Sequence, residues 1–268
     1  MRYITITFLT LTILLVNSFF NTASSQAERK LMIITMDGVR WSEIFTGIDK
    51  SLLNCTGLES SEHLTDRFWD EDFAMRRKVL MPFVWSYIAK HGALYGNRNF
   101  QNKVDVKNFF KISYPGYNEI FALDDKGIVA SNADYNNPNI TVLEYLNKNN
   151  NYRHSIAAFT SWYKFKYIYN IQRSNFYLSC NYNVTGELAD CNQNLEEIKN
   201  ILYKPNSTKE DGLTFLEAKD YIMNYHPKVV HIGFGESDEY AHKGDYSGYI
   251  MSINSCDKFI EDLWQLIQ

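Results

Sequence analysis

The sequence has no block of basic residues. It contains 27 lysines and arginines against 31 aspartates and glutamates, which gives a formal net charge of −4. Nucleic-acid polymers and anionic membranes are therefore poor partners, because both select clustered positive charge. There is also no internal repeat, and no proline- or serine-rich linker divides residues 28–268. We therefore expect these residues to form one domain.

Cysteine is scarce, with four residues in the whole chain: Cys55, Cys180, Cys191 and Cys256. None of them forms a C-x-x-C pair, and none lies near a histidine in zinc-ligand spacing, which argues against a cysteine-based zinc site. Cys180 and Cys191 flank a polar loop. They are the preferred disulfide pair if the protein is exported.

Long apolar runs are absent after residue 27, so no later segment is expected to span a bilayer. The N-terminus differs, because Arg2 precedes an apolar run at residues 3–20 and a small polar stretch at 21–27. This order predicts a secretory signal peptide, residues 1–27, cleaved before Glu28. The alternative is an uncleaved membrane anchor. We expect an exported protein, periplasmic or secreted, with no stable membrane insertion after cleavage.

Apolar runs alternate with segments of helical spacing along residues 28–268. Strands are predicted at 30–36, 94–100, 154–160 and 228–234, and helices at 81–93, 140–150, 211–227 and 246–268. This alternation predicts an α/β fold, with a mainly parallel sheet covered by helices on both faces. Residues 54–72 and 159–206 follow no clear period, and we expect both to be insertions over the edge of the sheet that carries the active site.

Three motifs carry side chains suited to catalysis. Asp37 follows the first predicted strand and precedes Gly38; Asp-Gly is also a common turn. Ser113 lies in Ser-Tyr-Pro-Gly before a predicted helix, where a helix N-terminus would favour an oxyanion or a phosphate, although a turn or cap explains it as well. Asp238 and His242 follow the last predicted strand, four residues apart, so one helical turn would place them on one face. An ordinary ion pair is the alternative there.

The order of these three motifs resembles the alkaline phosphatase superfamily, in particular its type I phosphodiesterase/nucleotide pyrophosphatase branch. The matching segments are "ITMDGVRWSEIF", "ISYPGYNEI", "GIVASNADYNNP" and "GESDEYAHKGDYSGY". The resemblance covers nearly all of residues 30–268. It implies a three-layer αβα sandwich that is incomplete at the C-terminus, and an alkaline phosphatase-like catalytic domain over residues 28–268.

The resemblance also implies a role for each matching residue. Ser113 would be the nucleophile and a metal ligand, and Asp37 would bind the same metal ion. Asp238 and His242 would bind a second ion. Asn132 would donate its side-chain amide to the phosphoryl oxygens, although its spacing from Gly127 is one residue longer than in the family. Lys111 is close enough in sequence to attract phosphate, but the family does not require a lysine there.

Two divalent metal ions are the implied cofactors, with zinc preferred and manganese or magnesium second. The family site uses three aspartates and three histidines. No Asp-His dipeptide occurs in this sequence, so some of the expected ligands are missing. We expect the 268 residues to be a fragment of a longer gene product or a truncated paralogue, and its activity is open.

The leading hypothesis is an exported, metal-dependent hydrolase of phosphate monoesters or diesters that forms a phosphoserine intermediate on a small substrate. The alternative is a metal-deficient, catalytically weak fragment or binding protein of the same fold. A sulfatase is less favoured because Tyr-Pro-Gly-Tyr follows Ser113, and the signal peptide argues against a phosphomutase. Substrate and oligomeric state stay open; Tyr114 and Tyr117 could stack on a nucleobase or simply pack.

Overall fold

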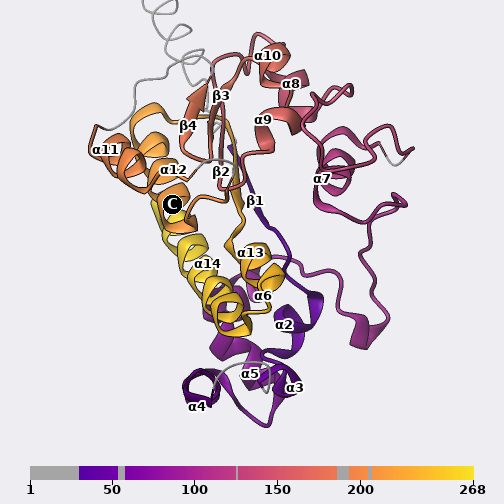
Figure 1. Ribbon diagram of the computed structural model, residues 1–268, viewed down its shortest axis with the longest axis vertical. Helices are drawn as coiled ribbons and strands as arrows, with labels where there is room; N and C mark the ends of the chain where they lie inside the picture. The colour runs from indigo at the N-terminus through magenta and orange to yellow at the C-terminus, as the bar shows by residue number, and fades with distance from the viewer. Residues whose placement is uncertain (1–29, 54–57, 125, 186–192, 205–206) are drawn as a thin grey trace, which may run out of the picture. The chain divides into compact units, whose positions relative to one another are not determined.

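The fold is given by a computed structural model (Figure 1). It describes residues 30–53, 58–124, 126–185, 193–204 and 207–268. The predicted signal peptide, residues 1–27, lies outside these residues. Among the described helices, none combines the length and the apolar character that a membrane crossing requires.

The preferred disulfide pair has only one member inside the described residues, because Cys191 lies outside them. Cys180 is a buried thiol, and its predicted pairing with Cys191 lies outside the described residues. Its sulfur donates to the backbone carbonyls of Trp162 and Tyr163, at 3.3 Å each. Burial raises the pKa of this thiol, so it is held in its neutral form.

The centre of the fold is a mixed sheet of five strands in the order β1-β5-β2-β3-β4. Its strands are β1 (Leu31–Met36), β2 (Ile156–Thr160), β3 (Tyr177–Cys180), β4 (Asn183–Thr185) and β5 (Val229–Phe234). β1, β5, β2 and β3 pair in parallel, and only β4 is antiparallel to its neighbour. The α/β class is therefore confirmed, as are the strands predicted at 30–36, 154–160 and 228–234.

The register aligns the carboxyl ends of three parallel strands. Met36 at the end of β1 pairs with Phe234 at the end of β5, and Gly233 pairs with Thr160 at the end of β2. Asp37 continues this alignment, since its N–H donates to the Phe234 carbonyl at 3.0 Å. Residues that follow β1 and β5 are thus brought side by side at one edge of the sheet, the usual ligand-binding edge of open α/β sheets.

Helical segments connect the strands. They are α2 (Trp41–Thr46), α3 (Lys50–Leu53), α4 (Leu58–Phe68), α5 (Phe73–Leu80), the π-helix η1 (Val84–Ile88), α6 (Ala89–His91), the 3-10 turn η2 (Arg98–Phe100), α7 (Ser113–Ala122), α8 (Val142–Asn147), α9 (Phe165–Ile168), α10 (Ile171–Ser174), α11 (Gln193–Leu202), α12 (Asp211–Tyr225), α13 (Glu236–His242) and α14 (Tyr246–Leu266). The helices predicted at 81–93, 140–150, 211–227 and 246–268 are all present.

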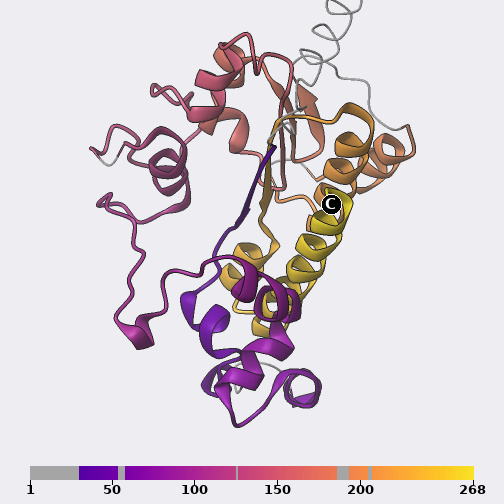
Figure 2. The ribbon, with the colours of Figure 1, turned by 180° about the vertical axis from the view of Figure 1, so that it is seen from behind.

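Apolar side chains pack on both faces of the sheet. In β2, Ile156 and Ala158 belong to a cluster with α7 and α9, whereas Ala157 and Phe159 belong to a cluster with α12 and α14. Successive strand residues point to opposite faces, so this alternation means that each face is covered. Figures 1 and 2 show the same division, with α12 and α14 on one side of β1, β2 and β5 and α7 on the other.

The structure differs from the sequence expectation in three segments. Residues 94–100 were predicted as a strand, and this is wrong: they include η2, because Gly96 has a φ of 98° and the Asn97 side chain caps Asn99 N–H at 3.1 Å. Residues 159–206, expected to be an insertion, supply β3 and β4 to the central sheet. Residues 54–72, the other expected insertion, contain α4.

One histidine is part of the core beneath this edge. His231 of β5 is fully buried, with Nε2 3.0 Å from Thr35 Oγ1 and Nδ1 2.7 Å from the Tyr169 hydroxyl. Both ring nitrogens therefore have partners while the imidazole stays neutral. Burial lowers the pKa of His231 to about 3.

This burial predicts a specific acid sensitivity. Below pH 6.5 the unfolded chain protonates residue 231, whereas the folded protein does so only near pH 3, so the unfolded state binds more protons in that window. Stability should fall with decreasing pH by up to about 1.4 kcal/mol per pH unit from this residue. His231→Gln should lose this part of the pH dependence of stability. His226→Gln, at an exposed position, should keep it. Urea unfolding from pH 4 to 7 measures the difference; equal slopes in all three proteins would contradict it.

Candidate active site

One cavity of about 770 Å³ lies where the chain leaves β1 and β5. Its walls come from the β1–α2 turn, from α7 and the segment before it, from the loop around residue 132, and from α13. All five predicted site residues line it: Asp37, Ser113, Asn132, Asp238 and His242. Lys111, noted in the sequence as a possible phosphate contact, lines it as well. Segments more than 200 residues apart therefore meet in one cavity.

The Asp37-Gly38 turn is both a tight turn and part of this cavity. Gly38 has a φ of 73°, a conformation that suits glycine. A Cβ at Gly38 would lie 2.7 Å from the Cα of Asp238, so a larger residue would push α13 away. The hydroxyl of Ser237 donates to the Asp37 carbonyl at 2.6 Å and fastens the two segments together. The turn is thus what allows α13 to approach β1.

Ser113 is the first residue of α7. Ile112 before it is extended, and the first turn closes with Gly116 N–H donating to the Ile112 carbonyl at 3.0 Å. The Ser113 hydroxyl donates to Asp37 Oδ1 at 3.3 Å. The nucleophile candidate and the strand-end carboxylate are therefore in contact across 76 residues of sequence, at the positive end of a helix dipole.

Asn132 is placed against the same helix end. Its Oδ1 accepts the Tyr114 N–H at 2.9 Å, which satisfies a backbone donor in the first turn of α7. Because the side-chain oxygen is used in this way, the NH₂ group is the part of Asn132 left to donate toward a ligand in the cavity. This arrangement is compatible with the role that the family resemblance implies.

Two carboxylates line this cavity, Asp37 after β1 and Asp238 on α13. Burial, together with the charge of Asp238, raises the pKa of Asp37 to about 6, although the Ser113 and Gly38 hydrogen bonds act in the opposite direction. Burial also raises the pKa of Asp238, which pairs with His242 through Oδ2 and Nε2 at 3.3 Å. Two repelling carboxylates in a partly buried site favour the binding of a proton or a cation between them.

The described residues contain no group of three or more histidine, cysteine, aspartate or glutamate side chains placed to hold one metal ion. The donors that line the cavity form two pairs instead, Asp37 with Ser113 and Asp238 with His242. Carboxylate oxygen and imidazole nitrogen suit zinc and similar divalent ions in their chemistry. The four residues that the resemblance implies as metal ligands therefore lie in one cavity, two in each pair.

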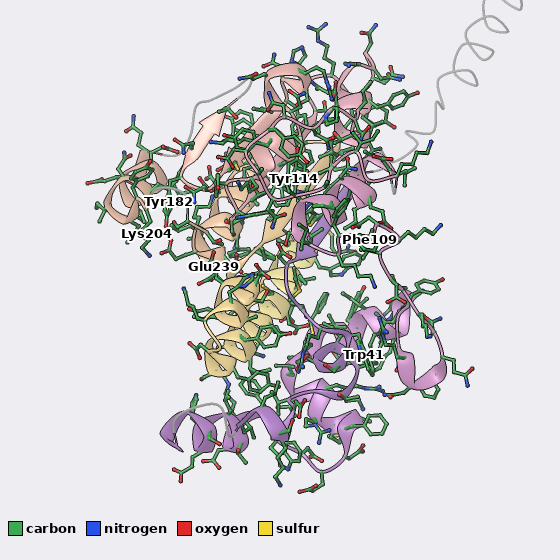
Figure 3. All side chains as sticks on the ribbon, turned by 45° about the vertical axis from the view of Figure 1, so that its right-hand side comes forward. Trp41, Phe109, Tyr114, Tyr182, Lys204 and Glu239 are labelled. Atoms are coloured by element: carbon green, nitrogen blue, oxygen red, sulfur yellow. The ribbon has the colours of Figure 1, made fainter. Side chains whose placement is uncertain are left out.

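Tyr114 and Tyr117 both pack within the fold. Tyr114 is fully buried and donates its hydroxyl to the backbone carbonyls of Tyr135 and Tyr167, and Tyr117 packs against Phe165 with ring centroids 4.6 Å apart. Figure 3 shows Tyr114 within the fold, whereas Phe109 lies on the segment before α7. Tyr114 is therefore a packing residue, whereas Tyr117 both packs and contributes to the cavity lining.

Asp211, which sequence motifs did not single out, fixes the start of α13. It is buried at the beginning of α12, and its Oδ1 accepts the Gly235 N–H at 2.8 Å while its Oδ2 accepts the Glu236 N–H at 3.1 Å. Ser161 donates to Oδ1 at 2.6 Å. In return, Glu236 Oε2 accepts the Asp211 N–H at 2.9 Å. The two helices cap each other, and this holds Asp238 two residues further along.

Comparisons with protein-family models, curated proteins and solved structures found no match for this chain.

Because Asp211 caps α13, its replacement should loosen that helix. Asp211→Asn keeps one acceptor oxygen but turns the other into an NH₂ group, which faces a backbone N–H. Burial raises the pKa of Asp211 to about 7, so the carboxyl group is ionised at pH 8. Losing a charge-assisted hydrogen bond at that pH costs about 1.5–3 kcal/mol, so amide hydrogen exchange over residues 235–242 should rise roughly tenfold or more. Hydrogen exchange followed by mass spectrometry measures this change.

Glu217→Gln is the matched control. Glu217 is also a buried carboxylate on α12, but its partners are Lys199, Lys209 and Ser179, away from α13. Its variant should leave exchange in α13 unchanged. An equal increase in both variants would show that general destabilisation, rather than the cap, controls α13.

Proposed function

We propose that this chain is a phosphoester hydrolase in which Ser113 forms a covalent phosphoserine intermediate, and that its sheet is the core of an alkaline phosphatase-like αβα fold. The observation that carries the proposal is the contact between the Ser113 hydroxyl and Asp37 at the N-terminus of α7. An isolated serine hydroxyl is a weak nucleophile and needs activation, which a helix end and an adjacent carboxylate or cation can supply.

The remaining cavity residues support the same chemistry. In the first half of the reaction, the Ser113 oxygen would bond to phosphorus while the ester oxygen leaves with a proton as an alcohol. In the second half, water would release phosphate and restore the hydroxyl. The NH₂ group of Asn132 would donate to a phosphoryl oxygen, because its own oxygen is engaged by Tyr114. Asp238 and His242 line the same cavity.

We also propose that the two donor pairs, Asp37 with Ser113 and Asp238 with His242, each bind a divalent metal ion. Zinc is the preferred ion. A bound divalent ion would stabilise the serine alkoxide and offset the charge of the phosphoryl group. Asp37 and Ser113 would hold one ion, and Asp238 and His242 the other. The raised pKa values of both carboxyl groups support this assignment, because a cation bound beside each carboxylate would offset the cost of ionising it in a buried site.

Removal of the Ser113 hydroxyl should abolish turnover. Ser113→Ala should lower kcat for 4-nitrophenyl phosphate or its diester by roughly a thousandfold or more, because no other group can form the covalent bond. Ser131→Ala, near Asn132 but outside the cavity lining, is the control and should keep full activity. Acid-quenched intact mass should show a phosphoryl adduct in wild type alone. Substantial activity in Ser113→Ala would contradict the mechanism.

Metal binding has a separate prediction based on stability. The pKa of Asp37 is higher in the folded protein than in the unfolded chain, so its ionised form costs stability above pH 6. Asp37→Asn should therefore stabilise the metal-free protein at pH 8. Zinc should raise the melting temperature of wild type through mass action, and should raise that of Asp37→Asn much less.

Asp134→Asn is the control for this experiment, because Asp134 pairs with Lys164 outside the cavity lining. It should respond to zinc as wild type does. If zinc stabilised all three proteins equally, the ion would bind elsewhere and the assignment of Asp37 would be wrong.

A further inference from the structure

The cavity is lined by two carboxylates, which poses a problem for a phosphate ester. Asp37 and Asp238 both line it, and both would repel the phosphoryl oxygens unless neutralised. Among the described residues of the lining, Lys111 is the one lysine or arginine. It lies two residues before Ser113, on the same wall as the nucleophile candidate.

The backbone of Lys111 is held in an uncommon conformation. Its φ is 50°, in the left-handed region that few non-glycine residues adopt. Asn108 Oδ1 accepts the Lys111 N–H at 2.9 Å and closes this short turn. Asn108 is itself almost completely buried, and its N–H and NH₂ groups both donate to Glu119 Oε2 at 2.9 Å. Two polar side chains thus maintain the turn.

Glu119 connects this turn to the nucleophile's helix. It lies on α7, and it also accepts the Lys107 N–H at 2.8 Å through Oε1. Burial opposes ionisation of this carboxyl group, but the hydrogen bonds from residues 107 and 108 lower its pKa overall. Lys111 and Ser113 are therefore positioned by one unit, α7 together with its preceding turn.

The Lys111 side chain does not maintain the turn that presents it. It is exposed, and no hydrogen bond or ion pair of its ammonium occurs within the described part of the chain. Strained backbone that persists near a reactive group is a reason to look for a functional role. Here the conformation belongs to a lysine that lines the same cavity as Ser113.

We infer that Lys111 recognises the second negative charge of a phosphate monoester, so that this site prefers monoesters to diesters. The inference builds on the proposed hydrolase function and concerns its substrate class. At pH 8 a phosphate monoester carries two negative charges and a diester carries one, so a single cation beside the phosphoryl group separates the two classes. Lysine suits this role as a compact point charge with three donors.

The test compares Lys111→Gln, Lys111→Arg and wild type as full chains equilibrated with zinc at pH 8. The first measurement is binding of inorganic phosphate and of dimethyl phosphate by calorimetry. Lys111→Gln should weaken phosphate binding roughly tenfold, and dimethyl phosphate binding by clearly less. Lys111→Arg should restore most of the phosphate affinity. Lys107→Gln, on the same segment but outside the cavity lining, should match wild type.

The second measurement is kcat/KM for 4-nitrophenyl phosphate and for bis(4-nitrophenyl) phosphate. The monoester-to-diester ratio should fall about tenfold in Lys111→Gln and recover in Lys111→Arg. Equal losses for both ligands, no loss at all, or no phosphate binding by wild type would each overturn the inference. Charge-dependent phosphate binding without turnover would instead overturn the hydrolase proposal and leave the role of Lys111 standing.

Discussion

The close approach of α13 to the turn after β1 is the constraint on which the candidate site depends. A Cβ at Gly38 would lie 2.7 Å from the Asp238 Cα, so the two segments are as near as their backbones permit. This approach sets Asp238 within charge–charge range of Asp37, which contributes to the raised pKa of Asp37. Had α13 begun one turn later, the cavity would contain a single carboxylate. The proximity of Asp37 and Asp238 is therefore a result of backbone packing.

Polar groups with little solvent exposure hold α13 close to the turn after β1. The carboxylate of Asp211 satisfies two backbone N–H groups at the start of α13, and Ser237 ties the same helix to the Asp37 carbonyl. A buried carboxylate without such partners would be costly, and a helix start without acceptors would be costly as well. Here the N–H groups at the start of α13 are the partners of the carboxylate, and the carboxylate is their acceptor. The site is thus held by interactions that have no part in binding a ligand.

Much of this arrangement could be predicted from sequence, and the remainder could not for identifiable reasons. The apolar strands β1, β2 and β5 and the residues that follow them are local signals in the sequence. Asp37, Asp238 and His242 could therefore be predicted as site residues. β3 was missed because its four residues lie between Asn175 and Asn181, both with left-handed φ values, and four residues are too few to show a period. Asp211 was missed because its partners are 24 and 25 residues away.

Lys111 shows a different limit of sequence reasoning. Its proximity to Ser113 was evident, but proximity alone could not say whether the residue lines the cavity. That placement accompanies the left-handed turn, which Asn108 and Glu119 maintain. Glu119 lies six residues after Ser113 on α7, so the helix that presents the hydroxyl also fixes the preceding turn. A shift of α7 relative to β1 would move the cation and the hydroxyl together and change the distance of both from Asp37. The geometry between lysine and serine is therefore a local property of α7, whereas the geometry between serine and aspartate depends on the packing of α7 against the sheet.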